Sequence, residues 1–370
     1  MDIKIILAAG GSGGHIFPSV ALASELEQIG VKKIHFVSSR RRLDKSILRD
    51  SKHDCFFLSI NPMPRKFNVF RFAVFIAKLV SDLLMSIYLI VRLRPDVVVG
   101  FGGYSSGAIS MTAKIFCVPV IIHEQNYFPG RANKILSRIV DKIAVSFKDS
   151  AQYFSHIPER IVYSGNPLRL DMMKKDRAQA AKRLGCFSDK KTVLIMGGSQ
   201  GSSFLNETAS KAAFWIVQKD ADIQFIHLTG KKDYESIRDF YRTNNIKGKV
   251  FSFLDRIDDA YALCDLAVTR AGAAAVFELA YYSKAMIMVP YPNPKNNQRT
   301  NALYFHNRGA AVYREEKDLT FSGLAKDMWD MLTDDARRDN ISRAAFGLSA
   351  PMAGKRLARA VIDLVKNKKS

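Results

Sequence analysis

The sequence has few cysteines and no cysteine pair. Its four cysteines, Cys55, Cys117, Cys186 and Cys264, stand far apart, with no C-x-x-C spacing and no histidine cluster nearby. This spacing excludes a disulfide framework and a structural zinc site, and it predicts buried free thiols in a reducing compartment. Proline-rich, glycine-serine and glutamine-rich tracts are also absent, while 48% of the residues are hydrophobic and 25% are charged. Such a composition excludes disorder as the main state.

Several signatures of targeting and ligand binding are missing as well. The amino terminus MDIKIILAAGG lacks the basic start, long apolar stretch and cleavage site of a secretory signal, so we expect a cytoplasmic protein. The sequence has no G-x-x-x-x-G-K-[ST] P-loop and no acidic residue placed to bind the ribose of a dinucleotide. No spacing of His, Cys, Asp or Glu suggests a metal cage, and we expect no metal or cofactor. The D-x-D triplet at residues 220–222 is interpreted as a turn.

Acidic residues are under-represented. The chain has 35 Asp and Glu against 56 Lys and Arg, a surplus of 21 positive charges. This surplus predicts attraction to nucleic acid, to a phosphorylated substrate or to an acidic membrane surface. A nucleic-acid-binding protein would show a recognised module, or surface aromatics interleaved with Lys and Arg, and neither is visible. We therefore expect no nucleic acid partner.

The sequence pattern repeats in the two halves of the chain. An apolar strand-like run at residues 3–9 is followed by a glycine loop and a helix with apolar residues on one face, and the same order returns from residue 192. Strands and helices then alternate in each half, with glycine or amide residues after the strands. Because 370 residues exceed the usual size of one core, we predict an α/β protein of two Rossmann-like doubly wound parallel-sheet domains facing across a cleft.

The predicted domain boundaries follow the composition of the chain. We expect an N-terminal domain at residues 1–164, a C-terminal domain at residues 165–345, and a basic helix at residues 346–370 that packs back on the N-terminal domain.

His15 directly follows the first glycine loop. A glycine loop that opens a helix can bind an anion through backbone N–H groups, although a tight turn with nothing bound explains each loop equally well. A neutral imidazole at this position can accept a proton as a general base. It can also simply hydrogen-bond a neighbouring carbonyl, and position alone favours neither role.

Polar residues follow two apolar segments. Asn126 ends the run His123, Glu124, Gln125 after a buried strand, where open α/β sheets bind ligands. For Glu124 we expect an internal salt bridge, for example with Arg131. Glu278 is a lone carboxylate in an apolar helix and is either a ligand for both hydroxyls of a ribose or ordinary helix surface.

The segment 67–91 is the strongest apolar stretch. Asn68, Arg71, Lys78 and Asp82 interrupt it, which argues against a transmembrane helix. Two alternatives stay open. The helix is a buried crossover element, or it offers Phe72, Phe75 and Leu79 to lipid while basic flanks contact anionic headgroups.

Several motifs together resemble the MurG family of bacterial glycosyltransferases, in order and over nearly the whole chain. They are GGSGGHIFP at 10–18, GFGGYSSG at 100–107, HEQN at 123–126, GNPLR at 165–169, GGSQG at 197–201, RAGAAAVFE at 270–278 and NNQ at 296–298. The resemblance implies the two-domain GT-B architecture and an inverting transfer of N-acetylglucosamine (GlcNAc) from UDP-GlcNAc. The acceptor would be the 4-hydroxyl of the muramoyl sugar of lipid I, which is linked to undecaprenyl pyrophosphate, and the product lipid II would serve peptidoglycan synthesis. It also implies a peripheral position on the cytoplasmic face of the inner membrane.

The same resemblance assigns expected roles to residues. His15 is the catalytic base, Arg169 and Ser199 hold the donor diphosphate, and Glu278 binds the ribose. The full set expected to contact UDP-GlcNAc is Ser12, Gly13, Asn126, Arg169, Ser199, Gln200, Gly201, Leu254, Ala274, Ala275, Glu278, Asn297 and Gln298. The residues expected at the acceptor and the membrane are Gly14, Gly103, Tyr104, Phe72, Phe75 and Leu79.

Three departures from the family pattern concern the donor site, and one of them is the loop at residues 291–295. Ala275 stands where a hydroxyl residue is common, and Asn297 stands where a glutamine is usual. A second enzyme hypothesis is a UDP-GlcNAc 2-epimerase, which has a similar architecture and uses the same nucleotide sugar without a lipid acceptor. In that case the apolar helix would belong to the core.

Overall fold

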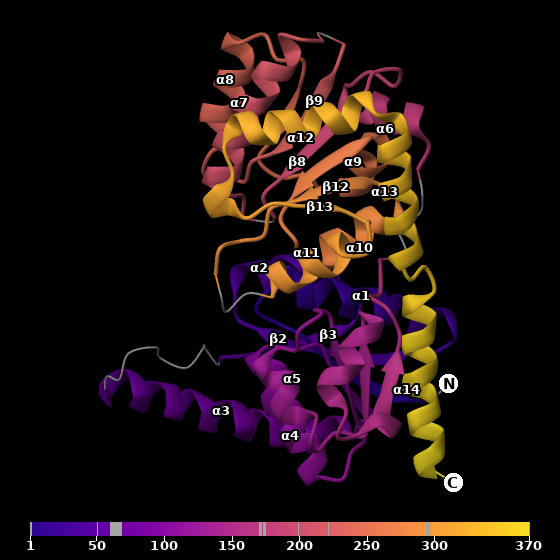
Figure 1. Cartoon of the computed structure of the whole chain (residues 1–370). Helices are drawn as coiled ribbons and strands as arrows, with labels where there is room; N and C mark the ends of the chain where they lie inside the picture. The colour runs from indigo at the N-terminus through magenta and orange to yellow at the C-terminus, as the bar shows by residue number, and fades with distance from the viewer. Residues whose placement is uncertain are drawn as a thin grey trace. The chain divides into compact units, whose positions relative to one another are not determined.

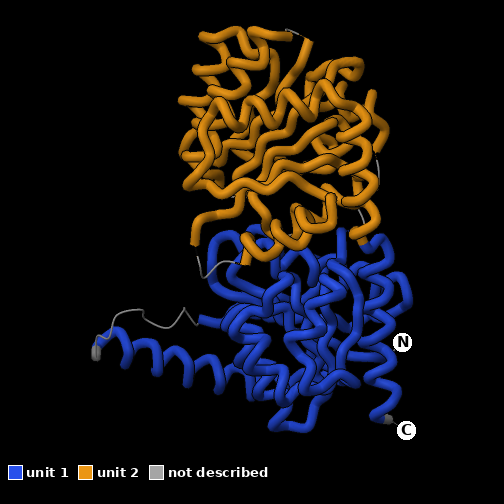
Figure 2. The backbone as a smooth tube through the Cα atoms, in the orientation of Figure 1, with its two compact units in different colours: residues 1–170, 350–370 blue, residues 171–349 orange. Residues whose placement is uncertain are grey.

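The computed structural model describes residues 2–49, 51–59, 69–169, 172, 175–198, 200–220, 222–293 and 297–369. The chain forms two compact units (Figure 2). Unit 1 comprises residues 1–170 and 350–370, and unit 2 comprises residues 171–349. The C-terminal segment is therefore part of unit 1.

Unit 1 is built on a seven-stranded sheet in the order β3-β2-β1-β4-β5-β6-β7. Every neighbouring pair of strands is parallel. The strands are β1 (Lys4–Ala8), β2 (Lys33–Ser39), β3 (Asp54–Leu58), β4 (Val97–Gly100), β5 (Val120–Glu124), β6 (Lys142–Val145) and β7 (Ile161–Tyr163). The helices are α1 (Gly13–Gln28), α2 (Arg42–Leu48), α3 (Val69–Leu93), α4 (Tyr104–Ile115), α5 (Arg131–Leu136), η1 (Lys148–Phe154), η2 (Pro158–Arg160) and α14 (Ala353–Lys369).

Unit 2 repeats this plan with six parallel strands in the order β10-β9-β8-β11-β12-β13. The strands are β8 (Thr192–Met196), β9 (Gln224–Leu228), β10 (Gly248–Phe251), β11 (Leu266–Thr269), β12 (Ala285–Met288) and β13 (Val312–Tyr313). The helices are α6 (Arg177–Leu184), α7 (Ser203–Val217), α8 (Tyr234–Thr243), α9 (Ile257–Leu263), α10 (Ala273–Tyr281), α11 (Gln298–His306), η3 (Glu316–Asp318), α12 (Phe321–Thr333) and α13 (Asp335–Leu348).

The strand order places the glycine loops at the switch points of the two sheets. In unit 1 the order reverses between β1 and β4, and in unit 2 it reverses between β8 and β11. Open α/β sheets bind ligands beyond the carboxyl ends of the strands at such a point. Both predicted glycine loops lie at these ends, and the prediction of two doubly wound parallel sheets is confirmed.

Buried apolar runs explain why the central strands could be read from sequence. Ile5, Ile6 and Leu7 of β1 are fully buried, because helices cover both faces of the sheet, so their side chains are apolar on both sides. One face packs against α1 and α14, where Leu26 and Val361 belong to the same core cluster.

Helix α3 does not fit the alternative of a buried crossover helix. Its first half projects from the rest of unit 1 (Figure 1), and only 22% of its most apolar window is buried. Phe70 and Leu84 are 77% and 62% exposed. The exclusion of a membrane-crossing helix was also wrong by composition, since Phe70–Leu93, with hydropathy 2.1, is long and apolar enough to cross a membrane by length and composition.

The polar residues of α3 explain this arrangement. Asp82 is 2% exposed, and its Oδ1 accepts a hydrogen bond of 2.8 Å from the backbone N–H of Ser59. Ser86 is also buried and donates to the carbonyl of Asp82. Polar side chains thus anchor the helix to unit 1, and much of its apolar surface faces outward.

The prediction of buried thiols holds only for Cys264. Cys55 and Cys186 are half-buried and Cys117 is exposed, and all of them are free.

Candidate functional sites in the two units

The first candidate site is the loop between β1 and α1. Ser12 precedes α1 in an extended conformation, and His15 lies in the first turn of the helix. The Nδ1 atom of His15 is 3.0 Å from the carbonyl oxygen of Gly10 and 3.3 Å from Oγ of Ser12. Because a carbonyl only accepts hydrogen bonds, we assign the ring proton to Nδ1. Nε2 then carries a lone pair that can accept a proton.

Glycines keep the surroundings of Nε2 open. A Cβ atom at Gly102, whose φ is +94°, would lie 3.3 Å from Nε2 of His15. A Cβ atom at Gly103 would lie 2.5 Å from the carbonyl oxygen of Gly10, closer than real contacts allow. Tyr104 follows at the start of α4 with an exposed side chain. The predicted acceptor residues Gly103 and Tyr104 therefore come from the loop that lies against His15.

The HEQN segment serves mainly to support Asn126. Glu124 is buried, and its Oε1 accepts from the backbone N–H and the side-chain amide of Asn126 at 2.9 and 3.2 Å. Its Oε2 accepts from the backbone of Gly130 and from Asn133, both at 2.9 Å. The predicted salt bridge to Arg131 is therefore wrong, because amide donors satisfy this carboxylate.

His123 is fully buried and structural. Its Nε2 lies 3.0 Å from the carbonyl oxygen of Gly165, and its Nδ1 lies 3.1 Å from Nε2 of Gln125. Burial lowers the pKa of His123 from 6.5 to about 4, so the ring is neutral and donates from Nε2. Of the HEQN side chains, the three before Asn126 are buried and only Asn126 is partly exposed.

Arg169 belongs to unit 1, although the sequence had placed it in the second domain. Its guanidinium lies 5.0 Å from the ring centroid of Phe17 in α1. Gly13 and Gly14 form the first turn of the same helix. Arg169 is therefore held against the helix that carries His15.

The second candidate site is the glycine loop after β8 in unit 2. A Cβ atom at Gly201, whose φ is +74°, would lie 2.0 Å from the carbonyl oxygen of Thr229. Asn206 donates to that same carbonyl at 2.8 Å. The loop is thus packed tightly against the end of β9, while Gln200 is exposed. The predicted diphosphate ligand Ser199 lies outside the described residues.

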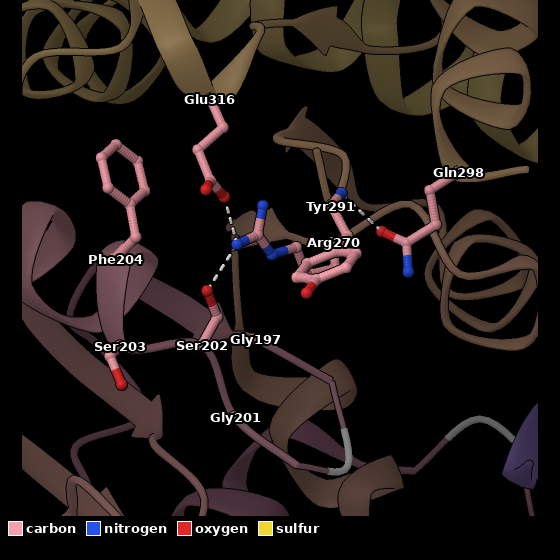
Figure 3. Close-up of a pocket in the computed structure, with 9 residues that line it drawn as sticks. All are labelled: Gly197, Gly201, Ser202, Ser203, Phe204, Arg270, Tyr291, Gln298 and Glu316. Atoms are coloured by element: carbon pink, nitrogen blue, oxygen red, sulfur yellow. Dashed lines mark hydrogen bonds and ion pairs between the residues drawn. The ribbon is translucent and has the colours of Figure 1, made fainter. Parts of the chain in front are cut away.

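A pocket of about 340 Å³ opens beside this loop (Figure 3). The buried side chain of Arg270, 4% exposed, extends into it. Arg270 donates to Oγ of Ser202, forms an ion pair with Glu316 and donates to the carbonyl of Val289 at 3.0 Å. The lining residues are Gly197, Gly201, Ser202, Ser203, Phe204, Arg270, Tyr291, Gln298 and Glu316.

Arg270 therefore joins three segments around the pocket: the glycine loop, the end of β12 and η3. Gln298 lies on the other side, where its Oε1 accepts a 2.9 Å bond from the backbone N–H of Tyr291. This bond fixes which end of the Gln298 amide is the acceptor. Asn297 precedes α11 and is partly exposed.

Glu278 lies in α10 and is 9% exposed. Its Oε2 accepts a 2.8 Å hydrogen bond from the hydroxyl of the buried Tyr261. This bond fixes the orientation of the carboxylate. Ala274 and Ala275 lie partly exposed in the first turn of the same helix, and Leu254 is partly exposed after β10. Ala275 offers no side-chain hydroxyl, so only backbone groups can serve an anion there.

Sequence reasoning missed the residues that hold these sites in place. Tyr261, Ser202, Glu316 and Asp44 of α2 stood in no motif that we recognised. Arg270 could have been recognised from the sequence, because it is the first residue of the 270–278 motif and directly precedes the AG turn after β11. Among the described residues no group of three or more His, Cys, Asp and Glu could hold a metal ion. Asp222 of the D-x-D triplet is paired with Lys190 at 2.6 Å.

Comparisons with known proteins agree over the whole length of the chain. The glycosyltransferase family 28 N-terminal domain matches residues 5–145, and the family 28 C-terminal domain matches residues 192–357. A protein of Flavobacterium psychrophilum is 34% identical over 99% of this chain and 99% of its own length. A protein of Halothermothrix orenii is 30% identical over 98% of this chain and 100% of its own. Both are named UDP-N-acetylglucosamine–N-acetylmuramyl-(pentapeptide) pyrophosphoryl-undecaprenol N-acetylglucosamine transferase.

Solved structures show the same fold. The crystal structure of Acinetobacter baumannii MurG is 25% identical, with a TM-score of 0.75 over 98% of this chain and 100% of that chain. A putative UDP-N-acetylglucosamine 2-epimerase of Listeria monocytogenes has a TM-score of 0.73 over 99% of this chain and 98% of its own, but is only 13% identical. The epimerase likeness therefore concerns the fold alone.

Proposed function

Because this chain belongs to glycosyltransferase family 28, we propose that it transfers GlcNAc from UDP-GlcNAc to the 4-hydroxyl of the N-acetylmuramyl sugar of a pyrophosphoryl-undecaprenol acceptor. The product is the disaccharide lipid used in peptidoglycan synthesis. The observation that carries the chemistry is the hydrogen bond between Nδ1 of His15 and the carbonyl of Gly10, which leaves Nε2 as a proton acceptor.

The proposed reaction is a single inverting displacement. Nε2 of His15 takes the proton of the acceptor hydroxyl while that oxygen attacks the anomeric carbon of GlcNAc. The bond from this carbon to the diphosphate oxygen breaks, and UDP leaves with the bonding electrons. The positive charge on His15 is favoured at that moment, because the Nδ1–H bond to Gly10 stabilises the imidazolium.

Unit 2 is proposed to hold the donor. Glu278, oriented by Tyr261, can accept both hydroxyls of the ribose, and the backbone at Leu254 can contact the uracil. Gln298 is proposed to bind the sugar. The loop containing Gln200 and Gly201 opens α7, where backbone N–H groups and the helix dipole favour the diphosphate.

Unit 1 is proposed to bind the acceptor and an anionic membrane surface. The exposed apolar residues of α3 suit the boundary between headgroups and acyl chains. However, Leu89 and Ile90 of the same helix lie in the core cluster with Val98 of β4, so the helix cannot leave unit 1 without opening that core. We therefore propose a peripheral position on the cytoplasmic face of the inner membrane, with no nucleic acid partner.

Measuring UDP release from UDP-GlcNAc, with and without a lipid I analogue, tests this function. We expect release that requires the analogue and a new disaccharide-lipid on chromatography. Acceptor-independent formation of a 2-epimer would instead support the epimerase hypothesis and overturn the transferase.

A further inference from the structure

A dense group of cations lies at the carboxyl end of β2 in unit 1. The five residues Arg40, Arg41, Arg42, Lys45 and Arg49, here called the β2–α2 cations, are all exposed. None of them forms an ion pair with any carboxylate among the described residues. Asp44, within the same run, does not neutralise them, because it is fully buried and points elsewhere.

The direction of Asp44 ties this group to the catalytic loop. Its Oδ2 accepts hydrogen bonds from the backbone N–H of Gly11 at 2.9 Å and of Ser39 at 3.2 Å. The carboxylate thereby fastens the start of α2 to the loop between β1 and α1. Arg41, which directly precedes α2, is carried to the edge of that loop.

Arg41 and His15 bind adjacent carbonyls of one glycine loop. Nη1 of Arg41 donates to the carbonyl of Gly11 at 2.8 Å, and Nδ1 of His15 lies 3.0 Å from the carbonyl oxygen of Gly10. The guanidinium of Arg41 and the imidazole of His15 are therefore held by neighbouring peptide groups of the same loop. A carbonyl carries no net charge, so the guanidinium keeps its charge, and most of its five N–H donors are available for an anion.

We propose that Arg41, supported by the other β2–α2 cations, binds the diphosphate of the lipid-linked acceptor. The inference rests on the proposed function, because the acceptor sugar carries its diphosphate at the opposite end of the ring from the 4-hydroxyl that His15 deprotonates. Arginine is suited to this role because its planar fork binds phosphate oxygens in pairs. With the diphosphate on Arg41, the sugar extends toward His15.

Titrating the full-length protein with geranyl diphosphate tests this site directly. The experiment is done by calorimetry without vesicles and with UDP at saturation, so that the donor diphosphate site is occupied. We expect Arg41→Gln to weaken binding about tenfold, the loss typical of a charged hydrogen bond. Arg41→Lys should bind with intermediate affinity, because lysine keeps the charge but loses the fork. Arg138→Gln, which removes an exposed arginine just after α5, is the matched control and should bind like the wild type.

Kinetics provide the second measurement. Arg41→Gln should raise the acceptor KM about tenfold while the UDP-GlcNAc KM and the melting temperature stay unchanged. Equal affinity for geranyl diphosphate in Arg41→Gln and wild type would overturn the proposal. The proposal would also be overturned if Arg138→Gln lost as much affinity as Arg41→Gln, because binding would then reflect the overall positive charge of the protein. Diphosphate binding that depends on Arg41 in a protein without transferase activity would leave this site standing and overturn the proposed function. Normal transfer with an unchanged acceptor KM in Arg41→Gln would leave the proposed function standing and overturn the diphosphate site at Arg41.

Discussion

His15 Nδ1 lies 3.0 Å from the carbonyl oxygen of Gly10, and this one contact selects the tautomer in which Nε2 is a base. Replacing His15 by Gln or Ala should lower kcat about 100- to 10,000-fold, the usual contribution of general base catalysis. The affinity for UDP should not change. Glu278 and Leu254, which are proposed to bind its ribose and uracil, lie in unit 2, whereas His15 lies in unit 1. Steady-state kinetics and calorimetry with UDP measure the two effects. A kcat within a few-fold of wild type would remove His15 from the mechanism.

Gly102 should also be sensitive to substitution, because it lies against His15. In Gly102→Ala the new methyl group would lie 3.3 Å from Nε2, and we expect kcat to fall at least about tenfold because the methyl group covers the base. The variant also places a side chain at positive φ, which costs about 1 to 2 kcal/mol. Gly309→Ala has the same kind of strain at φ +66° with nothing within 4 Å. It should therefore lose stability but keep kcat, and an equal loss of kcat in both variants would contradict the prediction.

The hydroxyl of Tyr261 should act on donor binding. Tyr261→Phe removes the 2.8 Å hydrogen bond to Glu278 without changing the volume of the core, so the UDP-GlcNAc KM should rise about fivefold, as expected for one hydrogen bond, with kcat little changed. Tyr241→Phe is the matched control, since this buried hydroxyl bonds His227 instead. If Tyr241→Phe raised the donor KM as much, the effect would reflect general loosening of unit 2.

His227 should make the stability of unit 2 dependent on pH. Burial lowers the pKa of His227 from 6.5 to about 3, so the unfolded state binds a proton more readily than the folded state. Its contribution is fully present above pH 6.5 and is lost as the pH falls from 6.5 toward 3. At pH 5 the loss is about 2 kcal/mol. Urea unfolding at pH 7.5 and 5 measures it. His227→Gln should show a smaller difference between the two pH values, and an unchanged difference would contradict the assignment.

The exposed apolar surface of α3 should control membrane association. Val80→Ser with Leu84→Ser removes two exposed side chains and should reduce binding to anionic vesicles about tenfold or more, because each buried apolar side chain contributes about 1.5 kcal/mol or more. Phe72, Phe75 and Leu79 are the residues named from sequence, and Phe72→Ser should act in the same direction. Phe346→Ser changes an exposed apolar residue of unit 2 and should leave vesicle binding intact. Flotation with vesicles measures the binding of the three variants and the wild type. Wild-type binding by the α3 variants would show that the membrane contact lies elsewhere.

Particular elements show how far the sequence could predict this structure. The apolar run expected from residue 192 is the strand Thr192–Met196, because a central parallel strand is buried on both faces and reads as one apolar run. The helix α3 was located to within two residues at either end, yet its orientation was not. Asp82 and Ser86 are buried against unit 1 while apolar residues such as Leu84 are exposed, which inverts the usual relation between polarity and exposure.

The candidate sites divide in the same way. His15, Asn126, Glu278 and Gln298 were selected as candidates by their places in motifs, but the partner of Glu124 was predicted wrongly. Amide groups of Asn126, Gly130 and Asn133 compete successfully with Arg131 for that carboxylate, and such competition depends on the path of the loop. Arg169 was likewise assigned to the wrong side of the boundary, because its contact with Phe17 joins residues far apart in the chain.

By itself, the sequence determined the two parallel sheets, the glycine loops at their switch points and the family, since these follow from local apolar runs and from the backbone freedom of glycine. Only the tertiary structure decided which nitrogen of His15 carries the proton, that Arg41 and His15 bind neighbouring carbonyls, and that Arg270 joins the glycine loop after β8 to η3. The hydrogen bonds of Arg41 and Arg270 are long-range, and their partners become neighbours only when the β–α loops meet at the carboxyl edge of a sheet. The contact of His15 with Gly10 is local and depends on the path of one loop.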